Sequence, residues 1–223
     1  METPAAPDSG RSSERAWWLR ALAVFQSPGP VFAALRDDSD AEVEARQEPV
    51  LALVLLAGLA GVLLAPSTGR LLDEEIVDGS LAVVAVVLFI SGAIYGAATY
   101  WIGGAAILVG LKGAGSRGSY RRARHVLAFA AAPLVLGLVL VWPLRLAVYG
   151  GDVFRSGGSD EGTGAAFFDA VLGFFALWAL GLLVYGISVV ERWSIGRAAI
   201  SLALMLLTIV IVTLPFLIPL ASR

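Results

Sequence analysis

The chain has no cysteine. This absence excludes disulfides, thiolate metal ligands, a cysteine nucleophile and S-palmitoylation. Only one histidine is present, His125, so a metal site built from several histidines of one chain is excluded as well. We therefore predict neither a metal site nor a bound cofactor.

Enzyme motifs are also missing, with no H-E-x-x-H and no phosphate-binding loop anywhere in the sequence. Ser91, which precedes Gly92 in an apolar segment, is the one candidate for an intramembrane nucleophile. Such a serine needs a neighbouring base. The candidates, Lys112 and His125, both lie in or beside a polar stretch that we place at the membrane surface. The sequence thus predicts a protein without catalytic residues, which is not an enzyme.

Charge is scarce: Asp, Glu, Lys and Arg make up 15% of the 223 residues, where soluble domains have about 25%. Hydrophobic residues make up 58%, and the mean hydropathy is +0.81. Lipid is therefore the expected solvent for most of the chain. The net charge of −2 gives no reason to expect a nucleic-acid partner. Fifteen of the sixteen basic residues are arginine, which indicates a GC-rich genome and hence a prokaryote.

Five segments of membrane length contain no charged residue. A helix needs roughly 20 mostly apolar residues to cross the hydrocarbon, where every backbone polar group must be satisfied internally. We therefore predict an all-α polytopic membrane protein, a five-helix transmembrane bundle preceded by a short N-terminal interfacial helical segment. The five spans are residues 49–69, 79–111, 126–144, 170–190 and 198–222.

The second span is unusually long at 33 residues, about 50 Å as a single helix at 1.5 Å per residue. Two spans with a turn would need roughly 38 residues. We expect one long helix that tilts or bends at Gly103-Gly104, with a re-entrant break there as the alternative.

A polar, glycine-rich stretch over residues 112–125 separates the second and third spans and has five basic residues but no acid. A basic loop between two spans marks the cytoplasmic face. With the N-terminus inside, the inner regions hold 12 Lys and Arg and the outer regions hold 4. We predict the plasma membrane of a prokaryote, with a cytoplasmic N-terminus and an outside C-terminus. The five basic residues, which are candidate lipid or partner contacts or only a topology signal, are Lys112, Arg117, Arg121, Arg122 and Arg124.

The 48 residues before the first span fall into a tail and an interfacial segment. We expect residues 1–13 to be disordered and residues 14–26 to form a helix, either lying on the membrane or packed against the bundle. Trp17 and Trp18 are the predicted interfacial anchors of that helix. After a proline-rich break we expect a short helix over residues 31–36. Residues 37–48, with six acids, read as a charged tether; residues 70–78 between the first two spans are acidic and suit a surface helix.

Glycines recur in the spans at helical spacing and predict close helix packing. This packing is either within one chain or along a homodimer seam. The four candidate positions are Gly92, Gly96, Gly173 and Gly181.

The sequence also predicts the environment of several polar and aromatic side chains near the ends of the spans and within them. His125 is expected to contact headgroups, and Asp169 to cap the fourth span at its outer end, where a helix N-terminus favours a carboxylate. An ion pair between Arg145 and Asp169 is a candidate without other support. The aromatic group Tyr95, Tyr100 and Trp101 either fills the bundle core or lines a lipid or substrate groove.

One stretch carries a family resemblance. Tyr120 and the basic residues after it run directly into a small-residue helix with Pro133. Together with an early element of proline, Phe32 and Leu35, a span containing Leu177-Trp178-Ala179-Leu180-Gly181, and a last span introduced by residues 194–199, this resembles the Yip (Ypt/Rab-interacting) family in its prokaryotic branch. The resemblance covers most of residues 25–220 and implies a helical, non-enzymatic membrane domain.

Two classes of function follow from these features. The first is a scaffold or adaptor that binds membrane lipids, other membrane proteins or a second copy of itself. The alternative is a small transporter or channel for a lipid or neutral solute, because the spans carry no charge at mid-depth for ion coupling. The domain boundaries expected are 1–13 for the tail, 14–48 for the interfacial helices and tether, and 49–223 for the membrane domain.

Overall fold

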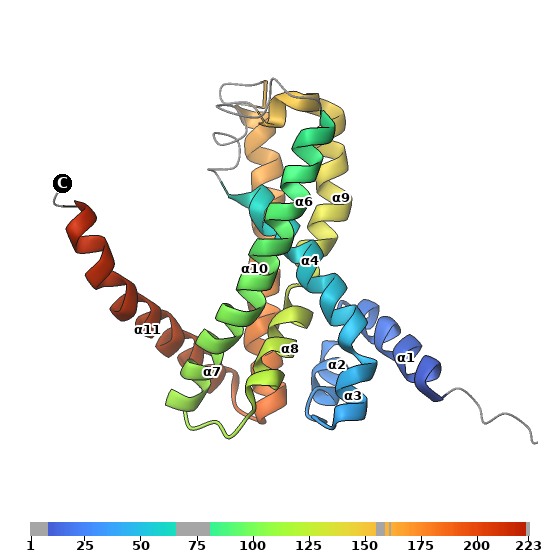
Figure 1. The fold of residues 1–223 in the computed structure, drawn as a ribbon, viewed down its shortest axis with the longest axis vertical. Helices are drawn as coiled ribbons and strands as arrows, with labels where there is room; N and C mark the ends of the chain where they lie inside the picture. The colour runs from blue at the N-terminus through green and yellow to red at the C-terminus, as the bar shows by residue number, and fades with distance from the viewer. Residues whose placement is uncertain (1–8, 66–80, 155–158, 161, 222–223) are drawn as a thin grey trace, which may run out of the picture.

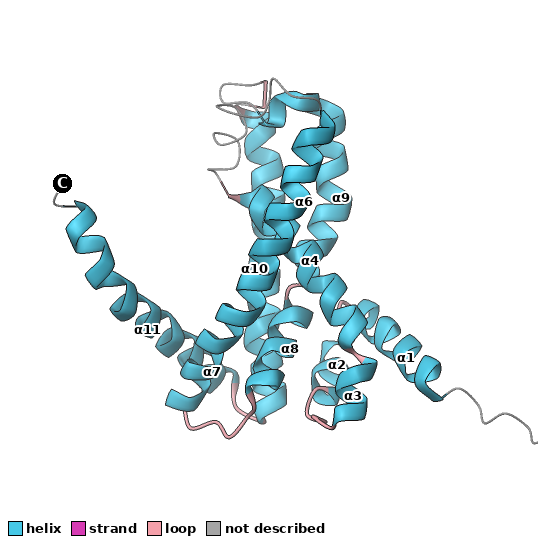
Figure 2. Ribbon diagram, viewed as in Figure 1, coloured by secondary structure: helices cyan, strands magenta, loops and turns pink. Residues whose placement is uncertain are grey.

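The computed structural model describes residues 9–65, 81–154, 159–160 and 162–221, and these residues contain helices but no strand (Figures 1 and 2). The acidic segment 70–78, predicted as a surface helix, lies outside them. The elements are α1 (Ser9–Ala23), α2 (Pro28–Ala34), α3 (Asp40–Ala45), α4 (Gln47–Leu64), α6 (Leu81–Ala98), the π-helical turn η1 (Thr99–Gly103), α7 (Gly104–Gly113), α8 (Tyr120–Ala130), α9 (Ala132–Tyr149), the 3₁₀ helix η2 (Gly150–Phe154), α10 (Thr163–Glu191) and α11 (Ile195–Ala221).

Five apolar helical segments confirm the predicted fold class, an all-α polytopic bundle. Four are long and apolar enough to cross a membrane: Gln47–Leu64, Ala82–Gly113, Tyr120–Phe154 and Thr163–Glu191. The fifth is the shorter apolar stretch Ile195–Ile211 at the start of α11. Figure 1 shows α4, α6, α9 and α10 side by side in one column, with α11 extending away from it beyond its contacts with α7 and α10.

The long second segment is helical without a break from α6 to α7. The irregularity is the π-helical turn η1, which comes just before the expected bend at Gly103-Gly104. A π turn inserts an extra residue into a helix and is frequently found at functional sites. Gly104 lies against the side chain of Arg124 on α8, so a side chain at this position would collide with it.

The third segment consists of two helices rather than one. Helix α8 ends at Ala130, and Ala131 separates it from α9. Pro133 lies in the first turn of α9, where a proline loses no helical hydrogen bond because that N–H has no partner. This places Tyr120, Arg121, Arg122 and Arg124 on a helix, while Arg117 lies in the connection before it. Ser119 caps that helix by accepting a hydrogen bond from the backbone N–H of Arg122.

The N-terminal segment is more ordered than the sequence predicts. Helix α1 already begins at Ser9, and the acid-rich segment read as a tether contains the short helix α3. Asp40 and Glu42 lie in the first turn of α3, where acids interact favourably with the helix dipole. The helices α1 to α3 pack at one end of the bundle, beside α4 and α10.

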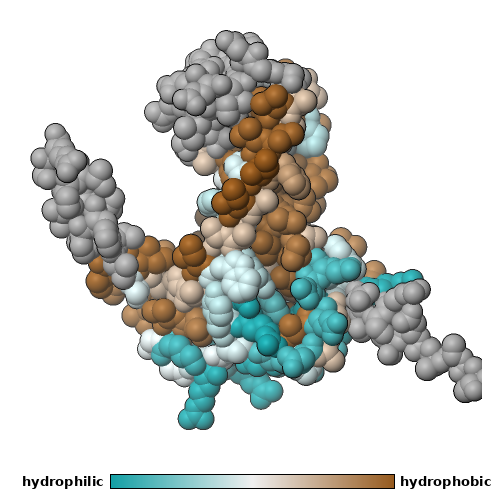
Figure 3. All heavy atoms as spheres, viewed as in Figure 1, coloured by the Kyte–Doolittle hydropathy of each residue, from teal (hydrophilic) through white to brown (hydrophobic). Residues whose placement is uncertain are grey.

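That end is the hydrophilic part of the molecule. Figure 3 shows hydrophilic side chains gathered around α1 to α3 and the connection from α7 to α8, and a hydrophobic column above them. We call this region the basic end, formed by α1 to α3, the first turn of α4 and residues 112–125. Among the described residues, the larger buried apolar cluster connects this region to the bundle, with members from α1, α2, α4, α7, α8, α10 and α11.

Candidate functional site

The basic end is organised around Arg46, a fully buried cation at the junction of α3 and α4. Its Nε donates to Nδ1 of His125 at 2.8 Å, one terminal nitrogen donates to the backbone oxygen of Asp37 at 2.8 Å, and the other pairs with Asp38 at 3.2 Å. Its guanidinium also lies 5.5 Å from the ring centroid of Trp17. Arg46 thereby connects α1, the segment before α3, and α8.

Burial lowers the pKa of Arg46 below its ordinary value, while the carboxylate of Asp38 acts in the opposite direction. An arginine remains charged even so, because its ordinary pKa is far above neutrality. Arginine has no acceptor, so the Nδ1 of His125 must offer its lone pair. His125 is therefore neutral, with its proton on Nε2.

His125 is thus not the headgroup contact that its position at the span edge predicts. It is 4% exposed, hydrogen-bonded to Arg46 and stacked on Tyr100 with 6.5 Å between ring centroids. The reason for the difference is that the helices α1 to α3 cover this edge of the membrane domain, which a count of apolar residues along the sequence does not reveal.

Some residues of the basic stretch bond to the N-terminal segment, and others are exposed. Arg121 pairs with Asp40 at 2.9 Å, and Arg122 donates to the backbone oxygen of Arg36 at 2.9 Å. Lys112 and Arg117 are exposed at the surface. The stretch is therefore partly a docking surface for the protein's own N-terminal segment.

Arg124 has a different environment, an aromatic cage. Its guanidinium carbon lies 3.9 Å from the ring centroid of Trp101, 4.5 Å from that of Tyr120 and 4.9 Å from that of Tyr100. The Tyr120 hydroxyl donates to the backbone oxygen of Trp101 at 2.6 Å and holds two walls of the cage together. Within the described part of the chain, Arg124 forms no side-chain hydrogen bond or ion pair, and its Nε is buried without a partner.

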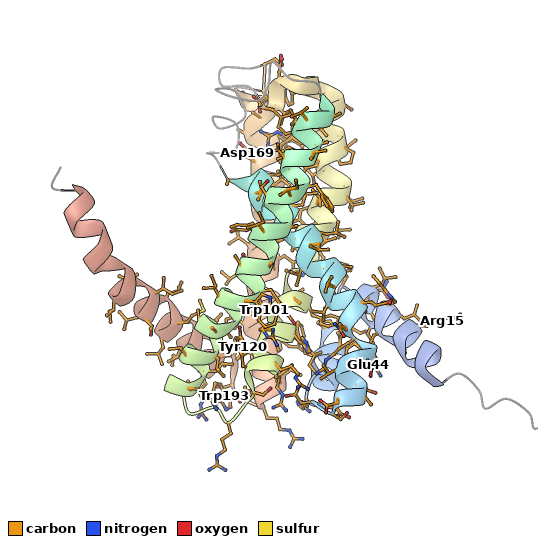
Figure 4. All side chains as sticks on the ribbon, in the orientation of Figure 1. Arg15, Glu44, Trp101, Tyr120, Asp169 and Trp193 are labelled. Carbon is orange, nitrogen blue, oxygen red and sulfur yellow. The ribbon has the colours of Figure 1, made fainter. Side chains whose placement is uncertain are left out.

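A groove of about 550 Å³ opens beside this cage, between α3 and α4 on one side and η1 and α8 on the other. Leu51 and Trp101, both about half exposed, lie at its rim, so it opens on the apolar surface of the bundle. Figure 4 shows Glu44 on α3 and the neighbouring Trp101 and Tyr120 near η1 and α8. The polar residues of its lining are Asp40, Glu44, Gln47, Tyr100, Trp101, Arg121, Arg124 and His125.

A second cavity, of about 370 Å³, lies beside this groove in the apolar part of the bundle. Val54 and Tyr100 line both spaces. Away from the groove the second cavity extends between α4, α6, α9 and α10 and is lined almost entirely by apolar side chains and glycines. Tyr95 and Trp101 are both about half exposed and line these two spaces, whereas Tyr100 also packs against the larger buried cluster.

The candidate packing glycines occupy two kinds of place. Gly92 and Gly96 lie where α6 crosses α4, against Leu59 and the backbone of Val54, with Gly58 of α4 facing both. Gly173 and Gly181 face open space, with no atom near the position of an added Cβ. The first pair therefore serves packing within the chain, and the homodimer seam stays a prediction that rests on the second pair.

The two predicted interfacial anchors, Trp17 and Trp18, differ in their exposure. Trp17 is fully buried; its ring lies 5.7 Å from Phe129, and its Nε1 donates to Glu42 at 2.9 Å. Trp18 is 42% exposed. Only Trp18 has the exposure that an interfacial anchor needs, and Trp17 instead fixes α1 to the bundle.

The end opposite the basic end holds the ion pair that the sequence only suggested. Arg145 pairs with Asp169 at 2.7 Å and with Asp160 at 3.1 Å, and Figure 4 shows Asp169 far from Glu44. No group of three acidic or histidine side chains suitable for a metal occurs in the ranges that the structure describes. Ser91 donates to the backbone oxygen of Val87 in its own helix.

Sequence reasoning missed Arg46, Asp38 and the cage of Arg124. A signal for Arg46 exists, because it is the only basic residue between 37 and 48 and follows five of the six acids there. No feature of the sequence indicates that its partner is His125 on α8. Likewise, no local sequence pattern predicts that the aromatic residues of η1 contact Arg124, because α7 and a connection separate them in the chain.

The helices and their apolar surface define a polytopic helical membrane protein. A model of the Yip1 domain family matches residues 22–217, and the chain belongs to that family. The match confirms the family that Tyr120, Pro133 and Phe32 indicate, while its prokaryotic branch stays a prediction. Neither the curated proteins nor the solved structures compared with the chain give a match.

Proposed function

We propose that the protein is a non-enzymatic membrane scaffold that holds one phospholipid of the inner leaflet in the groove between α3/α4 and η1/α8. In this proposal the basic end faces the cytoplasm, as the distribution of Lys and Arg predicts. The observation that carries the proposal is Arg124: a guanidinium with no hydrogen bond or ion pair to the described protein, placed in a groove that opens on the apolar surface.

Physical chemistry favours a phosphate as its partner. A guanidinium near lipid without a counter-ion is costly. Two oxygens of a phosphate can accept two parallel N–H bonds from it. The aromatic cage restricts the guanidinium to one place, so little entropy is lost on binding. The apolar cavity beside the groove would accept part of an acyl chain.

Photo-crosslinking tests this proposal. The protein is reconstituted in vesicles with a phospholipid carrying a diazirine in its acyl chain, and crosslinked peptides are mapped. We expect crosslinks concentrated on α4 and η1, reduced about tenfold by Arg124→Gln, which removes a charge-assisted contact. Lys112→Gln and Arg117→Gln, which change exposed basic residues outside the groove, should leave them unchanged. Crosslinks spread evenly over all apolar helix surfaces, unaffected by Arg124→Gln, would disprove the proposal.

The apolar cavity lies beside the groove, with Val54 and Tyr100 lining both, and this arrangement favours a second candidate, movement of lipid between leaflets. Vesicles containing a fluorescent phospholipid and an impermeant quencher distinguish it from a scaffold. A scaffold leaves the inner-leaflet fraction protected from the quencher, whereas a lipid transporter exposes it within the time of the assay.

A further inference from the structure

The charges around the groove specify its ligand more narrowly than a phospholipid in general. Two arginines, Arg121 and Arg124, and two acids, Asp40 and Glu44, line it, and His125 is neutral because it accepts from Arg46. The lining has no net charge. Arg121 and Asp40 pair with each other at 2.9 Å. Arg124 and Glu44 are left, one of each sign, neither with a hydrogen-bonding or ionic partner among the described residues.

Affinity in this groove must come from the headgroup rather than the chains. Acyl chains are surrounded by apolar material in the bilayer already, so moving one into the apolar cavity brings no hydrophobic gain. Charge-assisted hydrogen bonds are the contacts that bulk lipid does not provide. A headgroup is therefore selected by how well its charges match Arg124 and Glu44.

We infer that the groove selects a zwitterionic phospholipid with a primary ammonium, that is, phosphatidylethanolamine, its phosphate on Arg124 and its ammonium on Glu44. This inference rests on the proposed function. An anionic headgroup without an amine, such as that of phosphatidylglycerol, gains the same contact with Arg124 but places no cation beside Glu44 and Asp40. The ammonium has three N–H donors, and a carboxylate is an acceptor only.

The cage explains why a choline headgroup fits less well. A quaternary ammonium has no N–H donor and is bound in proteins by aromatic cages. The cage beside this groove, formed by Tyr100, Trp101 and Tyr120, is filled by the guanidinium of Arg124 itself. Choline is thus left with neither a hydrogen bond to Glu44 nor an aromatic box.

The test is native mass spectrometry of the full chain in detergent, titrated with dioleoyl phosphatidylethanolamine, phosphatidylcholine and phosphatidylglycerol. We expect about tenfold tighter retention of phosphatidylethanolamine than of the other two, the effect of one charge-assisted hydrogen bond. Glu44→Gln should abolish this preference but keep binding of all three lipids, and Arg124→Gln should weaken all three. Glu48→Gln, an exposed acid outside the groove lining, is the matched control and should change nothing.

A lipid series gives the same test without any variant. Replacing the ammonium hydrogens by one, two and three methyl groups removes donors stepwise, so retention by the unchanged protein should fall along the series. Equal, Arg124-dependent retention of the three headgroups, or a preference for phosphatidylglycerol, would overturn the inference but leave the proposed function standing. Retention that does not depend on Arg124 would overturn both.

Discussion

Arg46 donates its Nε–H to Nδ1 of His125 at 2.8 Å, so a residue before the first span fixes the protonation state of one 79 positions later in the chain. Both side chains are buried. A buried cation is stable only when its donors are satisfied. Arg46 bonds to His125, Asp37 and Asp38, so the N-terminal segment must pack against α8 for these donors to be satisfied. Docking of α1 to α3 and formation of the basic end are therefore coupled.

We expect Arg46→Met to destabilise the protein strongly. The variant leaves Asp38 and the Nδ1 of His125 without their buried partner, and breaking such a pair costs about 3–5 kcal/mol. Thermal unfolding of the detergent-solubilised protein should show the loss. Arg15→Met is the matched control, since Arg15 is an exposed arginine of α1. A variant at Arg46 as stable as the control would mean that the buried network contributes nothing to stability.

Removing both partners should cost less than the two single changes together. His125→Leu alone leaves the Nε–H of Arg46 without an acceptor, a penalty of about 1–3 kcal/mol. In Arg46→Met/His125→Leu the Nε–H and the Nδ1 that bond to each other are both removed, so a coupling energy of about 1–3 kcal/mol is expected from the double-mutant cycle. Strict additivity would show that the 2.8 Å contact is not a significant hydrogen bond.

The membrane domain could be predicted because its determinants are local. An uncharged segment of about twenty residues is enough to predict a membrane-spanning helix, whatever the rest of the chain contains. The boundaries were less predictable: α8 begins at Tyr120 and α10 at Thr163, because amphipathic turns extend the helices beyond the uncharged core. Likewise, the π turn at Thr99–Gly103 has no residue pattern of its own.

The site could not be predicted to the same extent, because it is made of pairs distant in sequence. The basic residues were identified, but the division between Arg121, held by Asp40, and Arg124, held by three aromatic rings, depends on how α3 and η1 approach α8. Trp17 and Trp18 are adjacent and chemically identical. One is buried and one exposed only because α1 presents a single face to the bundle.

That contrast makes the two tryptophans a matched pair for mutation. Trp17→Ala removes a buried ring that contacts Phe129 and hydrogen-bonds Glu42, and such large-to-small changes cost about 3–5 kcal/mol. Trp18→Ala removes a ring that is 42% exposed and should have a much smaller effect. Thermal unfolding measures stability, and limited proteolysis between α1 and α2 reports detachment of α1. Equal effects of the two changes would contradict the placement of α1.

The glycines of α4 and α10 allow a second matched comparison. A Cβ at Gly58 would collide with the backbone of Gly92 and Gly96, so Gly58→Ala should force α4 and α6 apart at a cost of about 1–3 kcal/mol. A Cβ at Gly181 meets nothing within 4 Å. Gly181→Ala should therefore be neutral or stabilise α10 by up to about 1 kcal/mol through helix propensity. If Gly181→Ala destabilised the protein more than Gly58→Ala, the close contact of α4 with α6 at Gly58 would be wrong.

The absence of cysteine makes orientation directly measurable, since any introduced thiol is the only one in the chain. Arg117 is exposed at the basic end, and Gly151 is exposed at the opposite end with open space around an added Cβ. An impermeant maleimide applied to intact cells should label the Gly151→Cys variant, and should label the Arg117→Cys variant only after lysis. This result follows from the excess of Lys and Arg on the inner side. Labelling of the Arg117→Cys variant in intact cells would reverse the orientation and would place the groove of Arg124 in the outer leaflet.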